Sequence, residues 1–149
     1  MKNNSNLKPV EILLVEDNSG DIRLTKEALK ESKLANNLYT VQDGIEAMDY
    51  LNKTEKYQDA VRPDLILLDL NLPKKNGREV LSEIKGNSDF KQIPVVILTS
   101  SKAYQDILST YQNHANCYIT KPVNMDQFIE IVKSVGNFWF SIVKLPRKS

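Results

Sequence analysis

Three carboxylates in this sequence stand directly after short apolar runs. Asp69 follows the run LILL at 65–68, and Glu16 with Asp17 follow a run that ends at Val15. A run this short and this apolar predicts a strand that is buried on both faces of a sheet. Burying an unpaired carboxylate is costly, so such a strand should end where water or an ion can reach the side chain. The pattern therefore predicts strand ends that open onto a polar crevice.

A hydroxyl and an ammonium group complete the set of strand-end residues. Thr99 follows the apolar run at 95–98, and Lys121 lies just beyond the run at 117–119. If these side chains met at one edge of a sheet, three carboxylates and one ammonium would leave a charge of −2. A divalent cation would cancel that charge, and a ligand set of carboxylate oxygens without His or Cys favours Mg²⁺.

Such a site suits the transfer of a phosphoryl group onto an aspartate. Carboxylates form covalent acyl phosphates, and a metal ion neutralises phosphoryl oxygens during in-line transfer. Asp69 would accept the group. Lys121 would hold one phosphoryl oxygen, and Thr99 would donate a hydrogen bond to another.

The elements that must position these residues alternate along the chain. Apolar runs predict five strands, and helical spacing of apolar residues predicts a helix after each strand. This alternation is typical of an α/β fold, a doubly wound parallel sheet with helices on both faces. The strands are expected at 12–15, 38–41, 65–68, 95–98 and 117–119, and the helices near 18–29, 45–53, 77–84, 104–111 and 124–143.

The strand order decides which strand ends meet. A common five-stranded solution is the flavodoxin-like order 2-1-3-4-5, in which ligands bind beyond the carboxyl ends of the strands. In that order the first and third strands are neighbours, so Glu16, Asp17 and Asp69 converge. Thr99 would lie on the other side of Asp69, and Lys121 one strand further.

Composition limits the class of protein. The 149 residues are 41% hydrophobic, which suits one domain with a proper core. A net charge of +1 gives no electrostatic footprint for nucleic acid. The single cysteine excludes an intrachain disulfide and a cysteine zinc cluster. We expect a cytoplasmic protein without a membrane contact, because the sequence has neither a long apolar span nor a signal-peptide start.

Four motifs, each at a strand end, together resemble the receiver domain of two-component response regulators. The resemblance covers roughly residues 9 to 135, and a single receiver domain over 1–149 is expected. Such a domain is a phosphoacceptor in signalling rather than an enzyme with its own substrate. The motifs are VED at 15–17, DLNLPKKNG at 69–77, TS at 99–100 and KP at 121–122.

The resemblance implies a role for each site residue. Asp69 would accept a phosphoryl group from a sensor histidine kinase. Glu16, Asp17 and Asp69 would bind Mg²⁺ together with the backbone carbonyl of Asn71. Phosphorylation would then be read out by a switch pair, Thr99 and Tyr118, while Lys121 contacts the phosphoryl group.

The C-terminal segment suggests a partner. An apolar stripe predicts an extended helix over about 125–144, whose last turns should project beyond the domain. We expect its aromatic residues, among them Trp139, to be buried in a homodimer. The long helix and the LLVEDN…GDIRL opening are similar to regulators paired with bacterial phytochrome kinases.

Three other functions fit parts of the pattern. An aspartate-nucleophile phosphohydrolase of the haloacid dehalogenase type would need an acid or base where this chain has the amide Asn71. A flavodoxin-like electron carrier would bind a phosphate where Glu16 and Asp17 would repel it. A degenerate receiver acting only as a docking module would not need the complete acidic set. Mass analysis after treatment with a phosphodonor and Mg²⁺ separates these alternatives.

Overall fold

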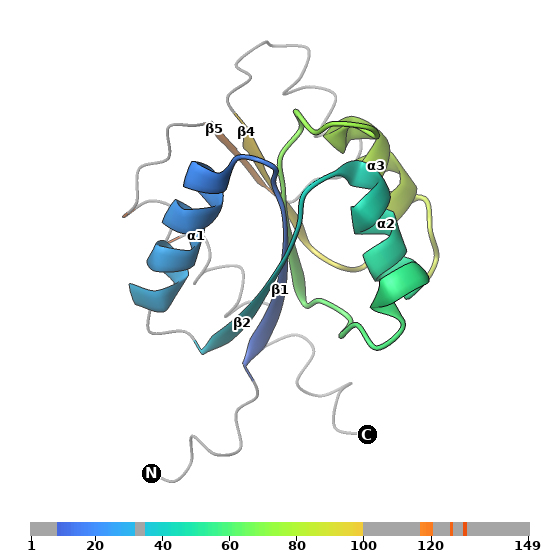
Figure 1. Cartoon of the computed structure of the whole chain (residues 1–149), viewed down its shortest axis with the longest axis horizontal. Helices are drawn as coiled ribbons and strands as arrows, with labels where there is room; N and C mark the ends of the chain where they lie inside the picture. Colours follow the sequence, from blue (N-terminus) through green and yellow to red (C-terminus); the bar gives the residue numbers. More distant parts are fainter. Residues whose placement is uncertain (1–8, 32–34, 100–116, 121–125, 127–129, 131–149) are drawn as a thin grey trace, which may run out of the picture.

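A parallel sheet with the strand order β2-β1-β3-β4-β5 forms the centre of the molecule. The computed structural model describes residues 9–31, 35–99 and 117–120, together with positions 126 and 130 (Figure 1). The strands are β1 (Val10–Val15), β2 (Asn36–Val41), β3 (Leu65–Leu68), β4 (Val95–Thr99) and β5 (Cys117–Thr120). The predicted parallel sheet is thus confirmed, and its strands follow the order expected from the sequence.

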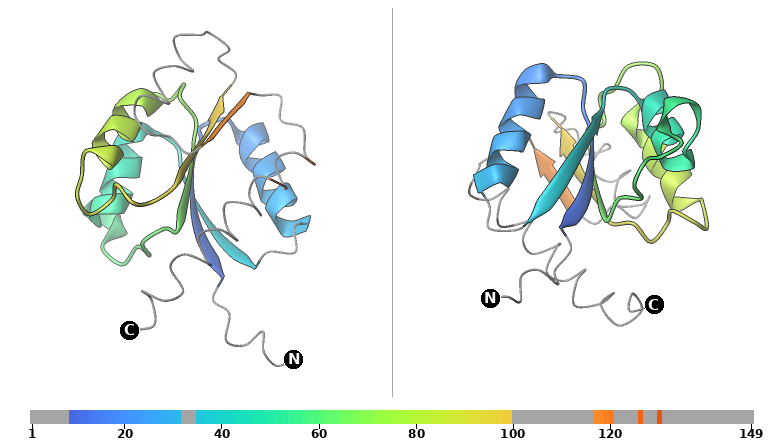
Figure 2. Two further views of the ribbon diagram at one scale, coloured as in Figure 1. Left: turned by 180° about the vertical axis from the view of Figure 1, so that it is seen from behind. Right: turned by 60° about the horizontal axis from the view of Figure 1, so that its bottom comes forward.

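Helices cover both faces of the sheet. The helix α1 (Ser19–Glu31) lies on one face, whereas α2 (Gly44–Asn52) and α3 (Gly77–Lys85) lie side by side on the other (Figures 1 and 2). A short 3-10 helix, η2 (Glu55–Tyr57), follows α2. The helix expected near 104–111 lies outside the described residues. So does the C-terminal helix expected over about 125–144, apart from the helical positions 126 and 130.

The side chains of the central strand β3 contribute to two hydrophobic cores of the described residues, one on each face of the sheet. Successive side chains of a strand point to opposite faces, so Ile66 and Leu68 pack with α2 and α3. Leu65 and Leu67 pack on the other face with Ala28 and Leu29 of α1. All four β3 side chains are buried. The continuous apolar run LILL is therefore the signature of a strand enclosed on both sides.

Two strands begin earlier than their apolar runs suggest. β1 starts at Val10 and β2 at Asn36, because polar residues continue the ladder between these strands. Glu11 pairs with Asn37, and the Asn37 side-chain amide donates to Oε1 of Glu11 at 3.3 Å. The polar residues Glu11 and Asn37 pair through a side-chain hydrogen bond rather than through apolar contacts. Hydrophobicity alone therefore did not reveal where these strands start.

The helices near the carboxyl edge of the sheet begin at side-chain caps. Asp43 accepts a hydrogen bond of 2.7 Å from the N–H of Glu46 at the start of α2. Asn76 and Glu79 form a reciprocal capping box at the start of α3. Such caps satisfy N–H groups that lack a partner within the helix. Among the described residues, the helices are all too short or too polar to cross a membrane.

Candidate metal centre at the carboxyl edge of the sheet

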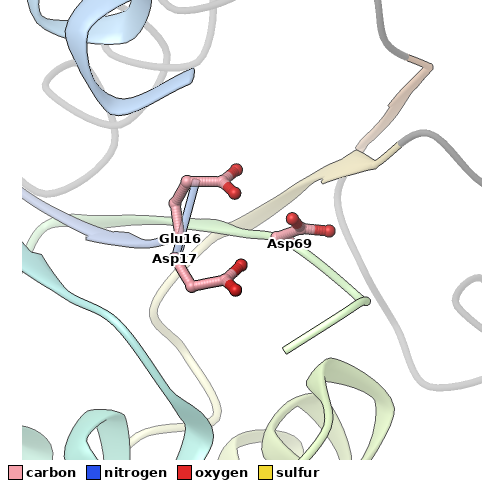
Figure 3. Close-up of side chains that lie close together, drawn as sticks. All are labelled: Glu16, Asp17 and Asp69. Carbon is pink, nitrogen blue, oxygen red and sulfur yellow. The ribbon is translucent and has the colours of Figure 1, made fainter. Parts of the chain in front are cut away.

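The register of β1 and β3 brings three carboxylates together. Val15 and Leu68, the last residues of these neighbouring strands, are paired. The N–H of Asp69 donates to the carbonyl of Val15 at 3.0 Å, which fixes the backbone of Asp69 beside the end of β1. Carboxylate oxygens of Glu16, Asp17 and Asp69 all lie within 4.8 Å of one another (Figure 3). The structure thus brings together the three acidic residues that the sequence singled out.

The three carboxylates differ in exposure. Glu16 and Asp69 are buried, with 2% and 5% of their surface exposed, whereas Asp17 is exposed. Backbone N–H groups hold the two buried side chains. Asn18 donates to Oε2 of Glu16 at 3.2 Å, and Asn71 donates to Oδ1 of Asp69 at 3.0 Å. The cluster is therefore anchored from within and is open to solvent at Asp17.

The donor set fits a hard divalent cation. Each of the three side chains offers a carboxylate oxygen, and among the described residues no nitrogen or sulfur ligand joins the cluster. Three carboxylates this close repel one another, and a dication offsets that repulsion. Mg²⁺ prefers oxygen ligands and keeps several waters, which the exposure of Asp17 permits. The arrangement of the three carboxylates therefore fits the Mg²⁺ ion that the sequence predicts.

The remaining predicted site residues lie along the same edge or beyond the described part of the chain. Asn71 lies in the loop that follows Asp69. Thr99 ends β4, the strand next to β3, and its backbone pairs with Thr120 at the end of β5. Tyr118 lies within β5, opposite Ile97. The side chains of Thr99 and Tyr118, and all of Lys121, lie outside what the structure describes, so their roles stay predictions.

Sequence reasoning missed a contact between the loop after β3 and the start of α2. Lys74, in the loop after Asp69, places its Nζ 3.6 Å from Oδ2 of Asp43. Gly44 follows Asp43 and packs against the backbone of Lys75. In the sequence, Gly44 directly precedes the helix expected at 45–53, and its lack of a side chain permits close packing.

The sequence matches the family model of the response regulator receiver domain over residues 12–133. The chain therefore belongs to the family of response regulator receiver domains, which act in two-component signalling.

Several relatives are similar over nearly the whole chain. Response regulator Rcp1 of Synechocystis sp. is 49% identical over 138 residues, which are 93% of this chain and 94% of Rcp1. The phosphorylated cyanobacterial phytochrome response regulator RcpA is 53% identical with a TM-score of 0.79, and the match covers 91% of this chain and 96% of RcpA. The Mn²⁺-bound form of Rcp1 has a TM-score of 0.78 and 49% identity, over 88% and 94% of the two chains.

Proposed function

We propose that this protein is a stand-alone response regulator that accepts a phosphoryl group from a sensor histidine kinase on Asp69. The observation that carries the proposal is the cluster of three carboxylates at the ends of β1 and β3. Asp69 directly follows β3, the middle strand of the sheet, and its carboxylate accepts a hydrogen bond from the following loop. The family membership supports the same reaction class.

The reaction requires one bond exchange at phosphorus. A carboxylate oxygen of Asp69 attacks the phosphorus of a phosphohistidine on the kinase, and the phosphorus–nitrogen bond breaks as the phosphorus–oxygen bond forms. The histidine nitrogen leaves with the electron pair and takes up a proton. Asp69 then carries an acyl phosphate.

The cofactor in this proposal is Mg²⁺. When bound, it neutralises the charge of the phosphoryl oxygens during transfer. Glu16, Asp17, Asp69 and the backbone carbonyl of Asn71 would hold the ion. Support comes from the all-oxygen donor set of this chain and from Rcp1, which was solved with Mn²⁺ bound.

Three further residues complete the proposed mechanism. Lys121 would bind a phosphoryl oxygen, and the hydroxyl of Thr99 would donate a hydrogen bond to another. Thr99 and Tyr118 would then act as the switch pair, because the phosphoryl group draws Thr99 toward Asp69. We propose no enzymatic activity beyond self-catalysed phosphorylation and dephosphorylation.

The proposed partner is a histidine kinase of the phytochrome type in the cytoplasm. The support is similarity, since RcpA is a phytochrome response regulator and the bacteriophytochrome response regulator RtBRR is 42% identical with a TM-score of 0.77. The receiver would fill residues 1–149, with its core at about 9–135. The match to 94% of Rcp1 favours signalling without an attached output domain. A net charge of +1 favours a protein partner over nucleic acid.

Dimerisation would provide the output. We propose that the C-terminal helix, over about 125–144, carries Phe138, Trp139 and Phe140 into a two-fold interface. Analytical ultracentrifugation at micromolar concentration, with and without phosphorylation, tests this assembly. A monomer in both states, with Trp139 fluorescence already that of a buried indole, would contradict it.

Intact-mass analysis with a small phosphodonor and Mg²⁺ tests the function itself. We expect wild-type protein to gain the mass of one phosphoryl group only when Mg²⁺ is present. The added group should be lost in alkali, as an acyl phosphate is. Wild-type protein that gains no mass with donor and Mg²⁺ would contradict the proposal.

A further inference from the structure

The loop between β3 and α3 is closed at its base beneath Asp69. The N–H of Gly77 donates to the carbonyl of Leu70 at 2.9 Å, so the two ends of the loop meet. A Cβ at position 77 would lie 2.2 Å from the carbonyl oxygen of Asp69. Leu70 and Leu72 anchor the loop further, because their side chains are buried in the core shared with α2 and α3.

The far side of the same loop is pressed against the first turn of α2. A Cβ at position 44 would lie 1.9 Å from the carbonyl oxygen of Lys75 and 2.7 Å from its carbonyl carbon. These atoms belong to the backbone, so a side chain at position 44 would require the loop or the first turn of α2 to shift. Gly44 is buried, and only a residue without a side chain permits this approach.

A second contact holds the loop at the same place. Lys74 has a φ of 68°, in the left-handed region, and its Nζ lies 3.6 Å from Oδ2 of Asp43. A non-glycine residue adopts this φ at a cost, which the surrounding contacts must offset. The loop is therefore held in a specific shape at both its base and its tip.

We infer that Gly44, on a helix that supplies none of the proposed metal ligands, is a positioning residue for the reaction at Asp69. The inference rests on the proposed function. Asn71 and Lys75 lie in one short loop whose ends are bonded to each other through Leu70 and Gly77, so we expect a shift at Lys75 to change the backbone at Asn71. Asn71 orients the Asp69 carboxylate through its N–H and is the proposed source of the metal-binding carbonyl.

The first test is the substitution Gly44→Ala, with Gly86→Ala as the matched control. A Cβ at position 86 would lie 3.2 Å from the carbonyl oxygen of Ser82, which is a much milder contact, and Gly86 has an ordinary φ of −89°. We expect calorimetric titration of the folded Gly44→Ala protein with Mg²⁺ to give a Kd raised by about 10-fold or more, the size typical of groups that orient metal ligands. The Kd of Gly86→Ala should match wild type.

Hydrogen exchange in the metal-free protein tests the positioning of Asn71 separately from metal binding. In the metal-free protein, the hydrogen bond from the N–H of Asn71 to Asp69 should protect that amide from exchange. We expect Gly44→Ala to speed hydrogen exchange at Asn71 while exchange in the strand β3 stays slow. Equal Mg²⁺ affinity and equal Asn71 protection in folded Gly44→Ala and wild type would overturn the inference.

A second variant keeps the inference testable if Gly44→Ala does not fold. Lys74→Gly removes the cost of a left-handed φ for a residue with a side chain, and it removes the ion pair with Asp43. The loop therefore becomes more flexible without a steric clash. Loss of a positive charge alone would raise Mg²⁺ affinity, whereas a loosened loop lowers it. A lowered affinity supports the inference, and an unchanged or raised affinity opposes it. Wild-type protein that binds no Mg²⁺ would instead contradict the proposed function.

Discussion

The backbone N–H of Asn71 donates a hydrogen bond of 3.0 Å to Oδ1 of Asp69. A side chain bonded to the backbone two residues further along makes an Asx turn, which fixes both the side-chain rotamer and the start of the loop. The carboxylate is thereby oriented by its own loop before any metal or phosphoryl group is bound. An amide oxygen in the same position could accept the same hydrogen bond.

The substitution Asp69→Asn should therefore preserve the fold and abolish phosphoryl uptake. Asparagine retains the acceptor for the Asn71 N–H but lacks the nucleophilic carboxylate. Far-ultraviolet circular dichroism should match wild type, and intact mass should not change with phosphodonor and Mg²⁺. An alkali-stable phosphoryl group on the variant would place the acceptor elsewhere.

Asp17→Asn should weaken Mg²⁺ binding without weakening the metal-free fold. Asp17 is the exposed member of the acidic cluster, so its loss removes a proposed ligand and relieves repulsion on Glu16 and Asp69. We expect the Kd for Mg²⁺ to rise by about 10-fold or more, with an unchanged or higher Tm in chelator. Asp59→Asn, at an exposed position outside the cluster, is the control with the same charge change. Equal Kd values for the Asp17 variant and wild type would exclude Asp17 as a ligand.

Thr99→Ala tests the proposed switch. The variant should still take up a phosphoryl group on Asp69, because the nucleophile and the acidic cluster remain. It should transmit less of the signal, since a population shift requires a contact that differs between the two states. The measurement is the phosphorylation-dependent change in sedimentation or tryptophan fluorescence. A change equal to that of wild type would leave Thr99 with no role in the switch.

Alkaline pH should destabilise the protein through Tyr50. Burial raises the pKa of Tyr50 from its usual 10 to about 12, and its hydroxyl donates to the carbonyl of Val61 at 2.9 Å. The unfolded chain then loses this proton at lower pH than the folded protein does. The contribution of Tyr50 to stability is therefore intact below about pH 10 and falls by up to about 2 kcal/mol as the pH rises to about 12.

Urea unfolding at several pH values measures this loss. Tyr50→Phe is the control, and its stability should fall less steeply over the same range. Part of the slope will remain, because the pKa values of Tyr39 and Tyr57 are also raised, first by burial and then by their hydrogen bonds to Glu11 and Glu46. Equal slopes for the variant and wild type would show that Tyr50 ionises normally in the folded state.

The parts of the fold that rest on local patterns were predictable from the sequence. The run LILL indicated a strand buried on both faces, and the strand-end carboxylates indicated the polar edge. Contacts between side chains that do not lie at strand ends were not predictable. Tyr39, Tyr50 and Tyr57 form a chain of ring contacts at centroid distances of 6.1 and 5.4 Å, although they belong to three different elements, β2, α2 and η2.

The close packing of Gly44 against the backbone of Lys75 escaped prediction for the same reason. Gly44 and Lys75 belong to different elements, and neither local propensity nor hydrophobic pattern reports that a helix start touches a distant loop. The cluster of three carboxylates could be inferred because its members directly follow β1 and β3. The contact between Gly44 and Lys75 could not, because it depends on distances that only the folded chain defines.

The attachment of the acidic cluster to buried strands has a consequence for divergence. Glu16 and Asp69 extend directly from strands whose side chains are enclosed on both faces, so few substitutions can move them without disturbing a core. The covering helices, in contrast, carry large apolar side chains that face solvent, such as Leu24 on α1 and Ile45 on α2. In duplicated copies of such a gene, the outer faces of the helices can therefore diverge while the acidic cluster keeps its geometry.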